Sequence, residues 1–299
     1  MGLWDQIRKI LQPGEEGPDV GRDVAALARL LEVAEESLRA LRPAYQEFAV
    51  PKRSGGTRTI SAPEPELKAL QRRILRRALA RLKSHPAAKG FERGLSIVDN
   101  ARPHAGKAVV VRMDLKEFFP STRLVRVEEF FHRAGWNRDA SRLLARLTTH
   151  RGGLPQGAPT SPKLANLVNR LMDVRLSRLA ERLCATYTRY ADDLTFSFAQ
   201  DVPEAIHDLV ARTKVIVDEF GYEIHHGKKL RIRRQHQRQL VTGLVVNDGI
   251  RLPRTTRRWL RAVEHRAKKG GDPPPTLTAG SYAGWMSFVS MVERQVGKG

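Results

Sequence analysis

The stretch Tyr190-Ala191-Asp192-Asp193 constrains the fold of this chain more than any other, because it places two adjacent carboxylates between two apolar, β-rich runs. The runs are residues 184–190 and 194–198. In the second run, large apolar side chains alternate with hydroxyl side chains, which is the period of a half-buried strand. The pattern predicts a β-hairpin that carries both acids at its turn.

A third carboxylate, Asp114, follows another apolar run, residues 108–113, which we predict to be a buried strand. Acidic pairs in turns are commonly only solvated loop tips, so the third acid gives the pair its interest. Three carboxylates without nearby histidine or cysteine suit Mg²⁺. We expect Asp114, Asp192 and Asp193, with the backbone carbonyl of Leu115, to hold two Mg²⁺ ions. Two ions about 3.5–4 Å apart could bind the attacking and leaving oxygens of a phosphoryl transfer.

Three segments occur in the order and approximate spacing of reverse transcriptase palms: the strand ending in Asp114, the loop 154–162 and the hairpin 190–193. Residues 51–60 and 67–71 resemble the fingers hairpin and helix of bacterial reverse transcriptases. Gly221-Tyr222-Glu223-Ile224, leading to Lys228, is similar to the next palm motif. The resemblance is to the group II intron-like superfamily of these enzymes.

Two shorter elements resemble signatures of the retron reverse transcriptases within that superfamily. They are Asn100-Ala101-Arg102-Pro103-His104 and Val241-Thr242-Gly243. The whole resemblance covers about residues 28–250 and extends more loosely over the last fifty. It implies an α/β (α+β) right-hand polymerase fold with fingers, palm and a short helical thumb. We expect N-terminal helices and fingers over 1–105, a palm over 106–245 with a fingers-like insertion around 150–165, and a thumb over 246–299.

The resemblance also implies a nucleotide site. One or more of Lys52, Arg53 and Arg58 would bind the triphosphate, and Arg58 is the first choice because a guanidinium can bind phosphate through two hydrogen bonds. Phe119 would lie under the sugar of the incoming nucleotide and exclude a 2′-hydroxyl; the alternative is a packed aromatic beside Phe118.

Two further parts of that site follow from the same resemblance. Gln156 and Gly157 would let strand and nucleotide approach closely, because glycine has no side chain. Lys228 is a candidate proton donor to the leaving pyrophosphate, although the adjacent Lys229 leaves the register open.

Nucleic acid is the expected partner of so basic a chain. The formal net charge is +21 and the isoelectric point is near 10.8, which favours a polyanion over an acidic protein or a membrane surface. We expect an arginine face along residues 66–83 to bind nucleic acid. The other residues expected to contact it are Asn100, His104, Val241, Thr242, Gly243, Arg254, Arg257, Arg258 and Arg261.

The remaining composition limits the class of protein. A chain of 299 residues suits a minimal enzyme, without an appended enzymatic domain. One cysteine, Cys184, excludes a disulfide within the chain and a cysteine-based zinc site, which favours the reducing cytoplasm. No apolar run approaches the roughly 20 residues of a membrane span, so no membrane partner is expected.

Motifs and charge together favour a retron-type RNA-directed DNA polymerase. By resemblance, it would copy a structured non-coding RNA, prime from an RNA 2′-hydroxyl, consume dNTPs and keep its RNA-linked DNA product. An effector protein and a role in antiphage defence are implied in the same way. The alternatives are a group II intron-like or other defence-associated reverse transcriptase with a conventional 3′-hydroxyl primer, or a catalytically decayed nucleic-acid-binding scaffold.

Overall fold

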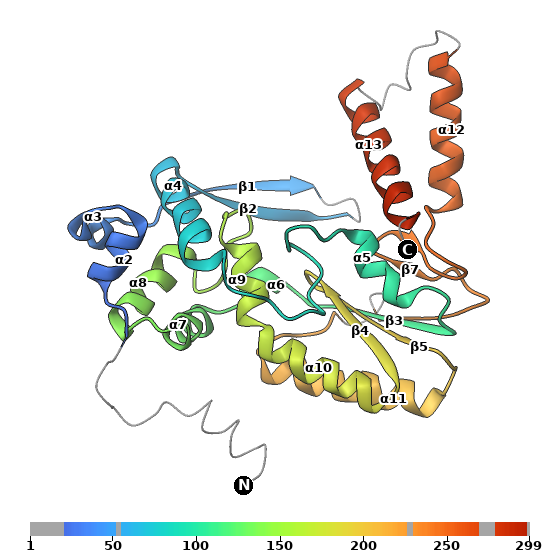
Figure 1. The fold of residues 1–299 in the computed structure, drawn as a ribbon, viewed down its shortest axis with the longest axis horizontal. Helices are drawn as coiled ribbons and strands as arrows, with labels where there is room; N and C mark the ends of the chain where they lie inside the picture. The colour runs from blue at the N-terminus through green and yellow to red at the C-terminus, as the bar shows by residue number, and fades with distance from the viewer. Residues whose placement is uncertain (1–20, 52–54, 226–229, 269–278, 298–299) are drawn as a thin grey trace. The chain divides into compact units, whose positions relative to one another are not determined.

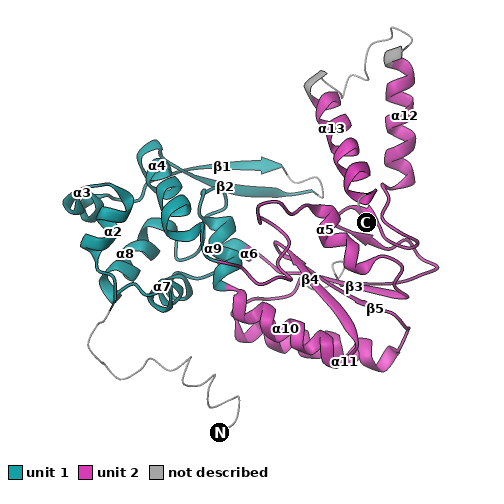
Figure 2. Ribbon diagram, in the orientation of Figure 1, with its two compact units in different colours: residues 1–82, 119–168 teal, residues 83–118, 169–299 magenta. Residues whose placement is uncertain are grey.

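The computed structural model describes residues 21–51, 55–225, 230–268 and 279–297. They form two compact units, Met1–Leu82 with Phe119–Val168, and Lys83–Phe118 with Asn169–Gly299 (Figure 2). The chain therefore leaves the first unit and returns to it before it completes the second. The borders of these units differ from the predicted limits at residues 105 and 245, and the division into fingers, palm and thumb stays a prediction.

The first unit combines helices with one β-hairpin (Figure 1). Strands β1 (Tyr45–Pro51) and β2 (Thr57–Pro63) pair antiparallel, as the sequence predicted for this region. The helices are α2 (Val24–Leu31), α3 (Glu35–Ala40), α4 (Pro65–Ile74) with the π-helical turn η1 (Leu75–Leu79), the short α6 (Phe118–Ser121), α7 (Leu124–Arg133), α8 (Arg138–Thr148) and α9 (Ser161–Val168).

Part of the predicted arginine face on α4 and η1 is used inside this unit. Arg73 donates to the carbonyl oxygens of Leu31 and Glu32, and Arg77 donates to that of Leu30 and pairs with the Glu32 carboxylate. The last carbonyls of a helix lack helical partners and carry partial negative charge. Arg73 and Arg77 therefore stabilise the end of α2, and the prediction of a nucleic-acid surface stays with the exposed Arg72, Arg76 and Arg81.

The second unit is built on an antiparallel sheet with the strand order β4-β5-β3-β6. These strands are β3 (Val109–Asp114), β4 (Ala185–Tyr190), β5 (Asp193–Phe198) and β6 (Arg231–Arg234). Helix α10 (Arg170–Arg182) packs against β4, and α11 (Pro203–Glu219) packs against α10, so these helices cover one face of the sheet (Figure 1). The predicted hairpin and the predicted buried strand are both confirmed.

An apolar cluster joins several short or terminal elements of the second unit. They are α5 (Ile97–Ala101), which continues into the 3₁₀ turn η2 (Arg102–His104), the hairpin β7 (Leu240–Val241) and β8 (Leu244–Val245), and the helix pair α12 (Arg254–Lys268) and α13 (Ala279–Val296). Its buried members include Val98, Ala101, Val241, Leu260 and Val292. None of the described helices combines the length and apolarity required to cross a bilayer.

A fully buried ion pair holds β4 to α10. Arg189 donates from Nε to Oδ1 of Asp173 at 2.8 Å and from Nη2 to Oδ2 at 2.6 Å, and both side chains are 0% exposed. The hydroxyl of Tyr187 donates to the same carboxylate at 2.9 Å. Burial, followed by the neighbouring Asp173, raises the pKa of Tyr187, so the phenol stays protonated and remains a donor. Several hydrogen bonds thus compensate for the desolvation of both charges.

Asp173→Ala should lower the free energy of unfolding by about 3–5 kcal/mol, because it leaves the Arg189 charge buried without its partner. The double variant Asp173→Ala/Arg189→Met should lose less than the single variant, since no unpaired charge remains. Urea denaturation at neutral pH measures both. A single-variant loss below about 1 kcal/mol, the magnitude of a solvated pair, would contradict this account.

Candidate active site in the second unit

The three predicted acids meet at one end of the four-stranded sheet. Asp193 opens β5 directly opposite Asp114, the last residue of β3, and Asp192 lies in the preceding turn. Backbone hydrogen bonds fix this end: the Leu115 N–H donates to the Asp192 carbonyl and the His225 N–H donates to the Asp114 carbonyl, both at 2.9 Å. All three aspartates are partly exposed. The geometry therefore gathers carboxylate oxygens at an accessible point.

Arg112 neutralises one of these acids. It lies two residues before Asp114 on the same face of β3, and its guanidinium forms a two-pronged ion pair with Asp193, with Nε 3.2 Å from Oδ1 and Nη2 on Oδ2. Burial raises the pKa of Asp193 while Arg112 opposes the rise, and the facing Asp114 adds to it. Like charges directly opposite on paired strands destabilise a sheet. Arg112 therefore compensates for the meeting of the two carboxylates.

Two of the three aspartates are suited to bind a hard divalent cation. Among residues 21–51, 55–225, 230–268 and 279–297, no three His, Cys, Asp or Glu side chains form a group that could hold a metal by themselves. Asp193, also predicted as a metal ligand, is paired with Arg112 here, and its role as a ligand stays a prediction. Mg²⁺ usually takes one or two carboxylates and completes its shell with water and substrate phosphates. Asp114 and Asp192 meet that requirement.

The turn that carries Asp192 has a strained backbone, and contacts with neighbouring residues stabilise it. Ala191 has φ = 57°, in the left-handed region, which costs a residue with a β-carbon roughly 1–2 kcal/mol. Nη1 of the buried Arg189 donates to the Ala191 carbonyl at 3.1 Å. Gly90 lies so close that a β-carbon there would be 2.8 Å from the Ala191 nitrogen. Arg189, Asp173 and Gly90 thus position the turn, and none of the three was predicted from the sequence.

The first unit contains the described nucleotide-site candidates. Gly157 has φ = 128°, and a β-carbon there would be 2.9 Å from Ile60 Cγ2, so only glycine allows the loop to reach β2. The Gln156 carbonyl accepts from the Ser61 N–H on the same strand, at 2.8 Å. Arg58, also on β2, is exposed. The structure thus brings Gln156 and Gly157 onto the strand that carries Arg58.

Phe118 and Phe119, which follow the strand that ends in Asp114, differ in burial. Phe118 is 4% exposed and stacks on Tyr222 with ring centroids 5.7 Å apart, whereas Phe119 is half-buried. Packing therefore accounts for Phe118 and leaves part of Phe119 accessible. Three other candidates, Lys52, Arg53 and Lys228, lie outside the described residues.

The Val241-Thr242-Gly243 element forms the tight turn between β7 and β8. Thr242 and Gly243 have φ of 45° and 84°, and positive values at both central residues are the requirement of a type I′ turn. Thr242 Oγ1 donates to the Ile97 carbonyl at 3.0 Å, which ties the turn to α5. The second retron-like element is therefore tied to α5, the helix that leads into the first, although 145 residues separate Thr242 from Ile97.

Burial changes the interpretation of three residues that we expected to contact nucleic acid. Asn100, His104 and Val241 are each 0% exposed, so in this structure their side chains present nothing to a bound strand. Neither polar atom of the Asn100 amide has a hydrogen-bond partner among the described residues. Along α12, by contrast, Arg254, Arg257, Arg258 and Arg261 are exposed, as a phosphate-contacting surface requires.

Known proteins resemble this chain over most of its length. A family model described as "Reverse transcriptase (RNA-dependent DNA polymerase)" matches residues 50–242. The retron Mx162 reverse transcriptase of Myxococcus xanthus is 40% identical over 288 residues, which cover 85% of this chain and 59% of that protein. The retron Ec86 reverse transcriptase of Escherichia coli is 37% identical over 252 residues, covering 83% and 77%. The chain belongs to the retron-type reverse transcriptases.

Solved structures agree on the fold. An apo telomerase from Candida tropicalis, truncated from its C-terminal domain, superposes with a TM-score of 0.51 at 12% identity, covering 70% of this chain and 55% of that one. At that identity the likeness shows the fold alone, and the predicted polymerase fold is confirmed. The chain spans 59% and 57% of the length of two Myxococcus xanthus relatives, the retron Mx162 and Mx65 reverse transcriptases.

His104, from the first retron-like element, joins the two strands of the hairpin that carries Asp192 and Asp193. Its Nδ1 lies 2.7 Å from Ser197 Oγ on β5, and its Nε2 lies 2.8 Å from Thr188 Oγ1 on β4. Burial lowers the pKa of His104 to about 3, and Lys107 acts in the same direction. In this retron-type reverse transcriptase His104 is therefore a neutral group that fixes β4 and β5 below the acids.

This burial makes stability depend on pH. The unfolded chain binds a proton at His104 near pH 6.5 and the folded chain only near pH 3, so acid favours the unfolded state between these values. The free energy of unfolding should fall by up to about 1.4 kcal/mol per pH unit in that interval. His104→Gln should lose this part of the slope in urea titrations from about pH 7 to about pH 4.5. His207→Gln, at an exposed position of α11, is the control; equal slopes in both variants would contradict the assignment.

Proposed function

We propose that this chain is an RNA-directed DNA polymerase that copies a structured non-coding RNA into RNA-linked single-stranded DNA, primed from an RNA 2′-hydroxyl. The observation that carries the polymerase activity is the meeting of Asp114, Asp192 and Asp193 at one end of the sheet, within a segment that matches the reverse transcriptase family. The proposed RNA priming rests on membership of the retron-type group and on its two signature elements.

The proposed chemistry assigns a role to each acid. Reverse transcriptases generally use divalent metal ions, and we propose two Mg²⁺ ions held by Asp114 and Asp192, with the Leu115 carbonyl as a further ligand. When bound, such ions lower the charge barrier to attack of a primer hydroxyl on the dNTP α-phosphate. Asp193 stays with Arg112 in this scheme and keeps β3 and β5 in register.

Substrate binding is proposed for the first unit. Arg58, on β2, would bind the triphosphate, and Gln156 and Gly157 lie against the same strand. The accessible part of Phe119 would select dNTPs by excluding a 2′-hydroxyl. Lys52 and Arg53 stay candidates for the triphosphate and Lys228 for the proton donor, as the sequence predicted.

The wider setting of the reaction is proposed on family resemblance. The exposed arginines of α12, Arg254 to Arg261, would contact the phosphates of the template RNA. An effector protein would act with the RNA–DNA product in antiphage defence. The single cysteine, Cys184, is free and exposed, which suits a protein of the reducing cytoplasm.

Asp192→Asn and Asp114→Asn should each abolish primer extension with Mg²⁺, because each removes a metal-binding charge while keeping nearly the same volume. Urea denaturation and RNA binding should remain close to those of the unchanged protein. Asp201→Asn, an acid outside this cluster that pairs with Arg234, is the control and should retain extension. Retention of more than a few per cent of extension by either cluster variant would overturn the metal assignment.

Priming is tested on the nucleic acid that co-purifies when the chain is expressed together with the genomic DNA that flanks its gene. We expect one branched RNA–DNA species whose DNA survives RNase and is released by an enzyme that cleaves 2′–5′ links, because only RNA offers a 2′-hydroxyl. DNA joined to RNA by a 3′–5′ bond would favour a conventional primer. Heterogeneous nucleic acid would likewise contradict self-priming.

A further inference from the structure

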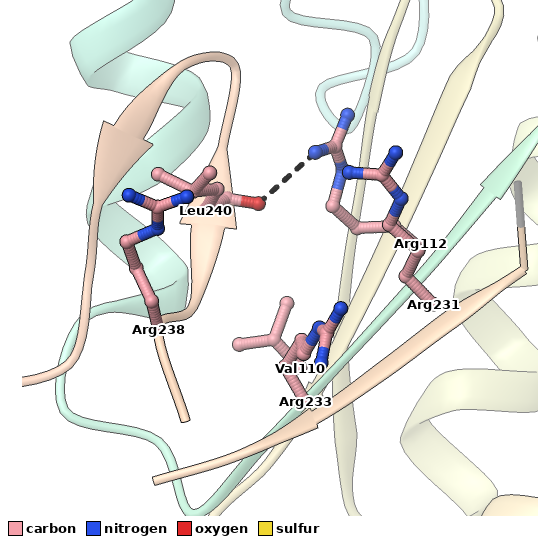
Figure 3. Close-up of a pocket in the computed structure, with 6 residues that line it drawn as sticks. All are labelled: Val110, Arg112, Arg231, Arg233, Arg238 and Leu240. Atoms are coloured by element: carbon pink, nitrogen blue, oxygen red, sulfur yellow. Dashed lines mark hydrogen bonds between the residues drawn. The ribbon is translucent and has the colours of Figure 1, made fainter. Parts of the chain in front are cut away.

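A pocket in the second unit is walled mainly by arginines (Figure 3). Its volume is about 360 Å³, and the described residues that line it are Val110, Arg112, Arg231, Arg233, Arg238 and Leu240. Figure 3 shows the guanidinium groups of Arg112 and Arg231 side by side, with Arg238 across the pocket from them. No acidic or aromatic side chain is among these lining residues.

Strand register creates this concentration of charge. On β6, Arg231 and Arg233 are two residues apart and therefore point to the same face of the sheet. They pair with Arg112 and Val110 of β3, respectively. Arg112 and Arg231 thus stand directly opposite each other on neighbouring strands, and like charges so placed favour a nearby anion. Asp193 pairs with Arg112, while Arg233 and Arg238 add further positive charge to the pocket. Arg234, one residue further, points away and pairs with Asp201.

The buried side-chain amide of Gln239 fixes the segment that carries Arg238, on the side of the pocket across from Arg112 and Arg231 (Figure 3). Gln239, which lies between Arg238 and Leu240, is 0% exposed. Its Nε2 lies within hydrogen-bond distance of three carbonyl oxygens, at 3.0, 3.2 and 3.1 Å. They belong to Lys107 and Ala108, which directly precede β3, and to Arg233 in β6. The Leu240 carbonyl in turn accepts from Arg112 Nη1 at 3.2 Å. The segment with Arg238 is therefore fixed against both strands before any ligand binds.

We propose that this pocket binds backbone phosphates of a nucleic-acid strand. Guanidinium groups match the geometry of phosphate oxygens and stay charged at every physiological pH. The lining offers no ring for stacking on a base and no side-chain amide for hydrogen bonding to one, so it recognises phosphate without reading sequence. The fixed backbone around Arg238 lowers the entropy cost of ordering the site.

The pocket adds a second, separate phosphate contact to the exposed arginines of α12. It also adjoins the site of synthesis through Arg112, which donates both to Leu240 at the pocket and to Asp193. This assignment rests on the proposed function only for the identity of the strand, which would be the RNA or its DNA copy.

The test compares two variants of the full chain. Arg233→Gln/Arg238→Gln removes two pocket charges, and Arg234→Gln removes one charge from the opposite face of the same strand. Fluorescence anisotropy of labelled RNA–DNA hybrids of two unrelated sequences, over a series of KCl concentrations, gives the slope of log affinity against log salt. The double variant should lower the magnitude of that slope by about 2 for both sequences, whereas Arg234→Gln should leave it unchanged. Urea denaturation verifies that both variants fold.

Two results would overturn the proposal. One is a double variant with the slope of Arg234→Gln. The other result would indicate a site for free anions and not for a strand. In that case inorganic pyrophosphate would stabilise the unchanged protein, but not the double variant, in thermal denaturation. The substitutions would leave hybrid binding unaffected. Primer extension by the unchanged protein is measured separately. Its absence, with the slope difference intact, would refute the polymerase proposal and leave the pocket assignment standing.

Discussion

The buried pair of Arg189 and Asp173 is the interaction on which the geometry of the candidate site depends. Burying two charges costs free energy, which close geometry and added hydrogen bonds must offset. Here the same guanidinium that binds Asp173 of α10 also binds the Ala191 carbonyl in the turn that presents Asp192. A stabilising contact of the core is therefore also the support of a strained backbone at the site. Packing of α10 against β4 and placement of Asp192 are linked through one side chain.

Charge is distributed in this chain by strand register. The net charge of +21 predicts a polyanionic partner but says nothing of where the arginines gather. The sheet brings Arg112, Arg231 and Arg233 to one face, and brings Asp114 and Asp193 together at one end. Arg112 takes part in both sites. It forms an ion pair with Asp193, one of the acids, and its side chain also lines the basic pocket.

Residues of the two retron-like elements have structural roles inside the protein, and these roles do not require direct contact with nucleic acid. Asn100, His104 and Val241 are interior residues, and the turn at Thr242 and Gly243 is tied to α5. Val241 belongs to the apolar cluster that includes Leu260 of α12 and Val292 of α13, and His104 contacts both strands of the hairpin that carries Asp192 and Asp193. Residues of this kind affect function by holding other groups in place, so a short motif alone does not reveal whether its side chains face solvent.

Sequence alone determined the hairpin at 190–193, the strand that ends in Asp114 and the mixed α/β class, because alternation of apolar and polar residues is a local property of strands. It also identified the family through motifs that are short and ordered. Only the tertiary structure decided that Arg112 pairs with Asp193, that Arg189 supports the turn and that Gln239 fixes the arginine pocket. Each of those contacts depends on a partner from another element, and Arg112 and Asp193 are 81 residues apart. The physical reason is that register and burial follow from how whole elements pack, which no local pattern records.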